Sequence, residues 1–181
     1  MISYEQIKTH PDIIAYIKAA DKSLEALGYT EHSFAHVGKV SACAGKILEV
    51  LGFSENDVEL AKIAGYIHDI GNHDEGTGVP VNEVAASLIL ADKTDVRRSR
   101  VRNNDFSTFD IHDRVNYSVV SSRLDIDVEN KIIRLVLVID TKISSIMDYF
   151  EIFLERMTMC RRAATRLGLS FKLTINNQNF I

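Results

Sequence analysis

The spacing of apolar residues changes once along the chain, and this change constrains the fold more than any other feature. Up to about residue 93, apolar residues recur at helical spacing, as Val37, Val40 and Ala44 do. Beyond about residue 115, β-branched residues become dense, most of all from Lys131 to Ile139. Runs of this composition are typical of β-strands. The sequence therefore predicts a helical part followed by a mixed part.

The helical part divides at residues that usually begin or end helices. Ser54 is a suitable N-cap, and Pro80 suits a first helical turn. Four helices are predicted: one that ends near Gly28, one over Ser33 to Leu51, one from Ser54 to about Gly71, and one from Pro80 towards the arginines at 97–102. The polar stretches from Asn72 to Gly78 and from Asn103 to Asp113 are expected to be loops.

The mixed part is expected to form a small sheet covered by one helix. The segments Val115 to Asp125 and Lys131 to Ile139 suggest a β-hairpin, and Phe171 to Ile175 suggests a further strand. Between them, apolar spacing predicts a long helix with a stripe of Ile143, Ile146, Met147, Phe150, Phe153, Leu154, Met157 and Leu167. The expected fold is mainly α, a helical bundle over residues 1–105, with a small C-terminal α+β (β-β-α-β) extension over 106–181 packed on it.

Composition narrows the class of protein. The net charge is −4 and charges of both signs alternate, so nucleic acid is not expected as a partner. The exception is a group of four arginines, Arg97, Arg98, Arg100 and Arg102, which suits either a solvated helix end or a phosphate site. No apolar run approaches the ~18 residues that span a bilayer. The two cysteines are expected to be free thiols, and a cytoplasmic location fits these features.

Three titratable residues occupy positions where the helical pattern expects apolar ones. His36 shares a face with Val40 and Ala44, while His68 and Asp92 continue the apolar faces of their own helices. A single inward histidine is readily explained as a hydrogen-bonded core residue. Buried carboxylates, however, usually need a partner or a metal. A set of imidazoles and carboxylates suits a divalent transition metal such as Mn, Fe, Co, Ni or Zn.

These residues stand in motifs that resemble a known family. Phe34-Ala-His36-Val, Ala64-Gly-Tyr-Ile-His68-Asp69-Ile-Gly71 and Leu88-Ile-Leu-Ala-Asp92-Lys are similar to the ordered His…His-Asp…Asp motif of the HD-domain superfamily. Two further stretches, Ala91 to Arg100 and Phe109 to Tyr117, are similar to a bacterial branch of HD-domain phosphohydrolases. The resemblance implies a helical, metal-dependent hydrolase of phosphate esters.

The resemblance also implies roles for individual residues. The metal ligands would be His36, His68, Asp69 and Asp92. Asp69 would accept a proton from the attacking water, so that Asp69 and His68 form the catalytic pair. Candidate substrate-binding residues are His32, His73, Lys93, Arg97 and Arg100. For His32 the alternative is a surface position at a helix start, and for His73 a loop surface or a second metal.

The sequence departs from the family pattern after the His-Asp pair. Relatives with two metals usually carry a further helix there, whereas here His68-Asp69-Ile-Gly-Asn72 runs directly into His73. Counted from Pro80, Asp92 lies roughly 18 Å along its helix, so a tight antiparallel hairpin would separate it from His68. An extended loop from Asn72 to Pro80 could span roughly 27 Å. The expectation is that the loop is extended and that Asp92 reaches the metal.

The predicted function is hydrolysis of a phosphate ester, for example a nucleotide, with a small phosphorylated molecule as ligand. The first alternative is an HD-fold binding or regulatory protein with an incomplete, inactive metal site, because of the shortened segment. The second is an interaction protein that forms a homo-oligomer through the C-terminal extension.

Overall fold

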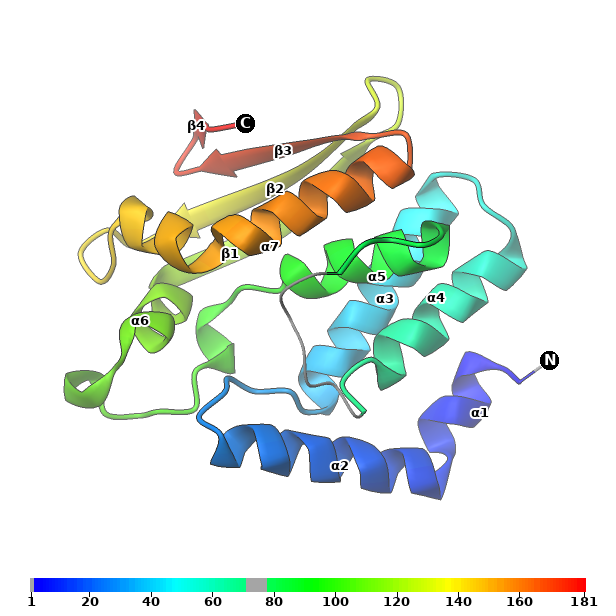
Figure 1. The fold of residues 1–181 in the computed structure, drawn as a ribbon, viewed down its shortest axis with the longest axis horizontal. Coiled ribbons are helices and arrows are strands. Elements are labelled where there is room, and N and C mark those ends of the chain that lie inside the picture. The colour runs from blue at the N-terminus through cyan, green and yellow to red at the C-terminus, as the bar shows by residue number, and fades with distance from the viewer. Residues whose placement is uncertain (1, 71–77) are drawn as a thin grey trace.

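The computed structural model describes residues 2–70 and 78–181 and is mostly helical, with a small sheet in the C-terminal part (Figure 1). This agrees with the predicted combination of a mainly α fold and a β-β-α-β extension. The helices described are α1 (Tyr4–Thr9), α2 (Pro11–Ala26), α3 (Phe34–Val50), α4 (Glu55–Ile67), α5 (Glu83–Lys93), α6 (Ile111–Ser118) and α7 (Ile146–Arg166), with 3₁₀ turns at Arg98–Arg100 and Phe106–Thr108. The strands are β1 (Val119–Asp127), β2 (Ile132–Ile139), β3 (Ser170–Ile175) and β4 (Gln178–Asn179).

Local sequence explains where α3 and α4 begin and end. The hydroxyl of Ser33 accepts a hydrogen bond from the Ala35 amide, and that of Ser54 accepts one from the Asp57 amide. Gly52 has φ of +78°, the left-handed conformation that favours glycine after a helix. The predicted cap at Ser54 and the predicted end of the preceding helix near Leu51 are therefore confirmed.

The sheet has the order β1-β2-β3-β4. Strands β1 and β2 form the predicted antiparallel hairpin, and β3 runs parallel to β2 after the crossover helix α7. Along β2, alternate residues are fully or nearly fully buried: Ile133, Leu135, Leu137 and Ile139. This two-residue period puts one face of the sheet against the helices. The short strand β4 was not predicted.

Helix α7 joins the sheet to the helical part. Its buried residues Tyr149, Phe153 and Met157 share one apolar cluster with Leu135 and Leu173 of the sheet. The same cluster contains Ile47 of α3 and Ala86, Leu90 and Val96 in and after α5. Residues on both sides of the predicted boundary at residue 105 thus contribute to one core, and Figure 1 shows α7 lying along the sheet beside α5.

Helices α3 and α4 cross at a contact between small residues. A Cβ atom added to Gly65 would lie 2.6 Å from the Cα atom of Ser41. The Ser41 hydroxyl donates a hydrogen bond of 2.7 Å to the carbonyl oxygen of Lys62 in α4. This close crossing brings the start of α3, which carries His36, towards the end of α4, which is followed by His68.

Some predicted boundaries and faces were wrong. The helix expected from Pro80 begins at Glu83 and ends at Lys93, before the arginines. Residues 115–118, expected in a strand, complete α6, whose N-cap Asp110 accepts a hydrogen bond from the Asp113 amide. On α7, Met147 is 74% exposed and Leu154 58% exposed, although both were predicted to be buried. The helix instead buries the stripe that includes Tyr149 and Cys160, because it meets the sheet on one side and α5 on the other.

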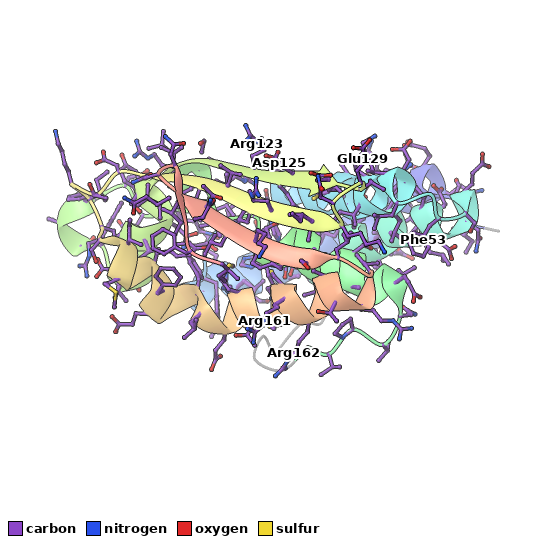
Figure 2. All side chains as sticks on the ribbon, turned by 90° about the horizontal axis from the view of Figure 1, so that it is seen from above. Phe53, Arg123, Asp125, Glu129, Arg161 and Arg162 are labelled. Atoms are coloured by element: carbon purple, nitrogen blue, oxygen red, sulfur yellow. The ribbon has the colours of Figure 1, made fainter. Side chains whose placement is uncertain are left out.

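The outer surfaces are charged. Figure 2 shows Arg123 and Asp125 on β1 and, on the opposite side, Arg161 and Arg162 on α7. Arg123 forms a bidentate ion pair with Asp125 through bonds of 2.7 and 2.8 Å.

Both cysteines are free thiols, as predicted. Across residues 2–70 and 78–181, none of the helices has the length and apolar character needed to cross a lipid bilayer.

The contact at Gly65 predicts opposite effects for two glycine-to-alanine substitutions. Gly65→Ala should lower the free energy of unfolding by about 1–3 kcal/mol, because the added methyl group meets the backbone of Ser41. Gly38→Ala in α3 should raise it by about 0.5–1 kcal/mol, since nothing lies within 4 Å of the added atom. Urea unfolding of both variants tests this, and equal effects would contradict the role given to the crossing.

Candidate metal centre

Three helix ends converge on one buried position. His36 lies in the first turn of α3, His68 and Asp69 directly follow α4, and Asp92 lies in the last turn of α5. Helices α4 and α5 both run from right to left in Figure 1, so their C-terminal ends point the same way. The expected proximity of Asp92 to His68 is confirmed, since the Asp92 Oδ1 atom lies 3.6 Å from His68 Nε2. The connecting loop, predicted to be extended, lies mostly outside the described residues.

The side-chain atoms that face one another are all potential metal ligands. His36 Nε2 lies 3.3 Å from Asp92 Oδ1 and 3.7 Å from Asp69 Oδ2. His68 Nε2 lies 3.1 Å from Asp69 Oδ1. Ligands about 2.1 Å from one shared ion would lie about 3.0–3.4 Å apart, whether the geometry is octahedral or tetrahedral. The observed separations are therefore close to those of ligands around one ion.

A hydrogen bond at the Nδ1 atom of each imidazole orients the ring so that the lone pair of Nε2 points into the centre. His36 Nδ1 lies 2.9 Å from Asp95 Oδ2, and His68 Nδ1 lies 2.9 Å from the carbonyl oxygen of Gly65. Both partners only accept hydrogen bonds, so each Nδ1 carries the hydrogen and each neutral Nε2 carries the lone pair. The buried atoms His36 Nε2, His68 Nε2 and Asp69 Oδ2 have no hydrogen-bond partner. Such a group of buried acceptors needs a cation.

The electrostatics of the metal-free centre indicate where that positive charge resides. Burial lowers the pKa of His68, but the close approach of the Asp92 carboxylate and the charge of Asp69 outweigh burial and raise this pKa above the ordinary value. Burial raises the pKa of Asp92, yet the nearby imidazoles of His36 and His68 and the charge of Lys93 bring it well below the ordinary value. The carboxylates therefore favour protonation of His68, so a proton and a metal ion compete for its Nε2 atom.

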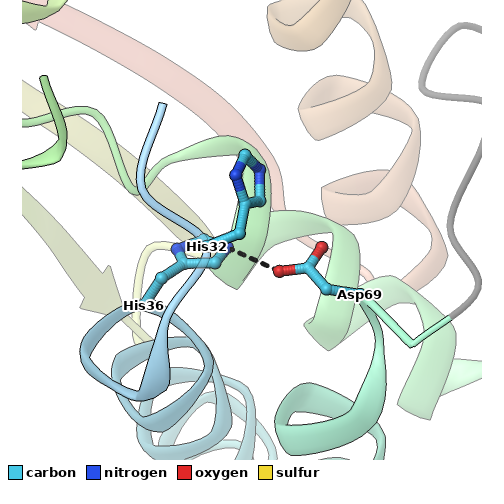
Figure 3. A group of neighbouring side chains, drawn as sticks. All are labelled: His32, His36 and Asp69. Atoms are coloured by element: carbon cyan, nitrogen blue, oxygen red, sulfur yellow. Dashed lines mark ion pairs between the residues drawn. The ribbon is translucent and has the colours of Figure 1, made fainter. Parts of the chain in front are cut away.

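The possible ligands form two overlapping groups of three. Ligand atoms of His36, His68 and Asp92 all lie within 4.8 Å of one another, and so do those of His32, His36 and Asp69. Figure 3 shows the second group, with the imidazole of His32 above that of His36 and Asp69 facing them. These buried histidines and aspartates can hold a metal ion. His36 belongs to both groups and is the centre of the arrangement.

Asp95 is a residue of the centre that sequence reasoning missed. Besides His36, its carboxylate accepts hydrogen bonds from Lys39 Nζ at 2.6 Å and from Arg97 Nε at 3.0 Å. Burial raises the pKa of Asp95, but its bonds to His36 and Lys39 hold this pKa well below the ordinary value. The available signal was its spacing, because Asp95 follows Asp92 by three residues, close to one helical turn.

His32 and Lys93, both predicted to bind substrate, lie beside the centre. The ring centroid of His32 lies 5.3 Å from that of His36. Burial lowers the pKa of His32, and the charge of Arg100 lowers it further, which favours the neutral imidazole. His32 is buried, which is not the surface position considered as the alternative. The ammonium group of Lys93, also buried, lies 2.8 Å from Asp92 Oδ2.

The arginines predicted to bind substrate have protein partners. Arg97 contacts Asp95 and lies 3.6 Å from a carboxylate oxygen of Glu31. Arg100 is buried, and its Nε donates a bond of 2.9 Å to the Glu31 carbonyl oxygen. Both side chains therefore fix the segment after α5 to the segment before α3, and their binding of phosphate stays a prediction. His73 lies outside the described residues.

The metal centre predicts that one divalent transition-metal ion binds per chain and stabilises the protein. At about 100 times its Kd, such an ion adds about 2.7 kcal/mol, or about 5–10 °C in Tm for a chain of this size. The gain should shrink as the pH falls below the raised pKa of His68, because a proton then competes with the ion. Melting curves with Mn, Fe, Co, Ni or Zn, together with elemental analysis, test this.

The matched variants for that experiment are His68→Ala and His112→Ala, because His112 is exposed on α6. His68→Ala should lose the ion and the gain in Tm, whereas His112→Ala should keep both. A metal-dependent shift that persists in His68→Ala would place the ion elsewhere.

The bond from His36 to Asp95 predicts a positioning role for this carboxylate. Asp95→Asn should weaken metal binding about 10–100-fold, because a partner that orients a ligating histidine is altered. Lys39→Met removes another partner of Asp95 but keeps the bond to His36, so it should change the metal Kd less than threefold. Isothermal titration with the metal measures both constants, and equal losses in both variants would contradict the role.

Comparisons with known proteins add no family to this description. No protein-family model matches the chain, and neither a curated protein nor a solved structure matches it. Its function is therefore inferred from the metal centre itself.

Proposed function

We propose that the chain is a metal-dependent phosphohydrolase of the HD-domain type, which hydrolyses a phosphate ester. One observation carries the proposal: buried acceptor atoms of His36, His68, Asp69 and Asp92 face one another with spacings suited to one ion. These residues follow the order of the His…His-Asp…Asp motif, and the resemblance to that motif implied that they bind a metal.

The ligand set suits hydrolysis at phosphorus. A divalent ion such as Mn, Fe, Co, Ni or Zn supplies Lewis acidity towards a phosphoryl oxygen and lowers the pKa of water. His36, His68, Asp69 and Asp92 would hold the ion, and the two carboxylates would balance its charge. A mixed nitrogen and oxygen set of this kind leaves coordination positions for water and substrate.

Asp69 is the proposed proton acceptor. Its Oδ2 atom is buried without a hydrogen-bond partner, and Oδ1 lies 3.1 Å from His68. A carboxylate with a free lone pair at this position can take the proton of the attacking water. Lys93, beside Asp92, offers its remaining ammonium hydrogens to a phosphate oxygen.

The proposal predicts hydrolysis that depends on both the ion and Asp69. The metal-loaded chain should hydrolyse 4-nitrophenyl phosphate or bis(4-nitrophenyl) phosphate, and the preference between them tells a monoesterase from a diesterase. Asp69→Asn should lower kcat at least about 100-fold, because general-base catalysis contributes about 10²–10⁴. Release of nitrophenolate measures both rates.

The control is Glu129→Gln, which changes an exposed carboxylate in the turn between β1 and β2 (Figure 2). It should leave kcat unchanged. If the chain binds one ion but hydrolyses neither ester, the alternative of a binding or regulatory protein with an inactive centre replaces this proposal. This alternative is favoured by the observation that Arg97 and Arg100 are each already bound to other groups of the chain.

A further inference from the structure

Strand β1 leaves one edge of the sheet open. The sheet order is β1-β2-β3-β4, so β1 pairs with β2 on one side only. Within the described part of the chain, no backbone hydrogen bond from the stretch Ser121 to Asp127 goes to any segment other than β2. At the opposite edge, β4 and Phe180 pair with the end of β3. A long open edge such as that of β1 is a template for a further strand.

The apolar side chains of β1 are less covered than their neighbours on β2. Leu124 and Ile126 are partly buried. Their cross-strand partners, Leu135 and Ile133, are fully buried. All four side chains belong to or pack against one apolar cluster. The core therefore thins towards the open edge, where a further strand would cover Leu124 and Ile126.

The other face of β1 carries two opposite charges. The side chain of Arg123 is 68% exposed and that of Asp125 is 44% exposed. They point to the same side because they are two residues apart on a strand, and Figure 2 shows both at the rim of the molecule. Leu124 lies midway between them. A two-fold axis at Leu124 would therefore bring Arg123 of one copy opposite Asp125 of a second copy, and the reverse.

This charge pattern selects one register for pairing between two copies. Two antiparallel strands related by two-fold symmetry pair about one central residue. With Leu124 at the centre, two cross-strand pairs of opposite charge form. With Ile126 at the centre, Asp125 would instead lie opposite Asp127 of the second copy. Opposite charges directly across a pair of strands stabilise it, and like charges destabilise it.

We propose that two copies of this chain pair through their β1 strands, antiparallel and with Leu124 at the two-fold axis, so that the two sheets become one. The pairing provides partners for the open backbone groups of β1 and covers its apolar side chains. The same register brings Val120, 59% exposed, near Val128, 48% exposed, because these valines stand at the two ends of β1. The proposal does not depend on the proposed function.

The dimer is expected to be weak and to dissociate on dilution. Its contact is a single pair of strands, which lies at the low end of protein interfaces, below about 1,200 Å². Sedimentation equilibrium of the full chain, from low micromolar to near-millimolar concentration, measures the Kd. The mass of the native chain should rise from that of one chain towards that of two.

Two charge reversals test the register. Arg123→Asp and Asp125→Arg each place like charges opposite each other twice in a dimer, so each alone should raise the Kd at least about tenfold. An equimolar mixture of these two variants should dimerise about as tightly as the native chain, because opposite charges then meet across the axis. A chain that carries both reversals should recover in the same way.

The control is Arg162→Asp, which reverses an exposed charge on the opposite side of the molecule (Figure 2) and should leave the Kd unchanged. Circular dichroism checks the fold of every variant, and recovery on mixing requires both variants to be folded. A native chain that stays monomeric at every concentration overturns the proposal. So does a dimer whose Kd neither reversal changes, because it then uses another surface. Loss in both variants without recovery in the mixture overturns the register at Leu124.

Discussion

The convergence of buried lone pairs at the ends of α3, α4 and α5 is the constraint on which the rest of the site depends. Two imidazole nitrogens and two carboxylates, held 3.1–3.7 Å apart, repel one another unless a positive charge lies among them. The neighbouring carboxylates raise the pKa of His68, so a proton and a metal ion compete for its Nε2 atom. Folding and ion binding are therefore linked, because the same side chains contribute to both.

The surrounding shell keeps these lone pairs pointed inward. Asp95 contacts His36, Lys39 and Arg97, so one carboxylate ties the start of α3 to the segment after α5. Arg100 ties the same segment to the chain just before α3 through Glu31. Arg97 and Arg100, which the sequence suggested for phosphate binding, thus fix the segments around the centre to one another. A phosphate group that reached them would have to displace the carboxylates of Asp95 and Glu31 from Arg97 and backbone carbonyl oxygens from Arg100.

Much of the fold was predictable from the sequence, because helical spacing, caps and β-branched runs act locally. Ser54, Gly52 and the hairpin ending at Ile139 are examples in which local chemistry decided the outcome. The errors lay where tertiary contacts decide. Val115 to Ser118 could form either a strand or a helix, and the cap at Asp110 favours the helix. Met147 and Leu154 are apolar but point away from both the sheet and α5.

The candidate site was predictable in part. His36, His68, Asp69 and Asp92 were identified by their place in apolar patterns and by resemblance, and the structure brings them together. Asp95 was missed because its three-residue spacing from Asp92 does not by itself tell a buried carboxylate from a solvated one in a polar segment. The inclusion of His32 in a ligand group depends on how the loop before α3 is folded, which spacing does not determine.

The shared core of α5 and the sheet also affects how the protein acquires its centre during synthesis. Leu90, two residues from Asp92, packs in the same cluster as Leu173 and Ile175 of β3. These strand residues lie about 80 residues after Asp92 in the chain. They therefore leave the ribosome several seconds after it, at about 5–20 residues per second. On the nascent chain, His36 and His68 emerge before the strand residues against which α5 packs have been made. We expect ion uptake to follow the docking of β3 and to mark the end of folding rather than its beginning.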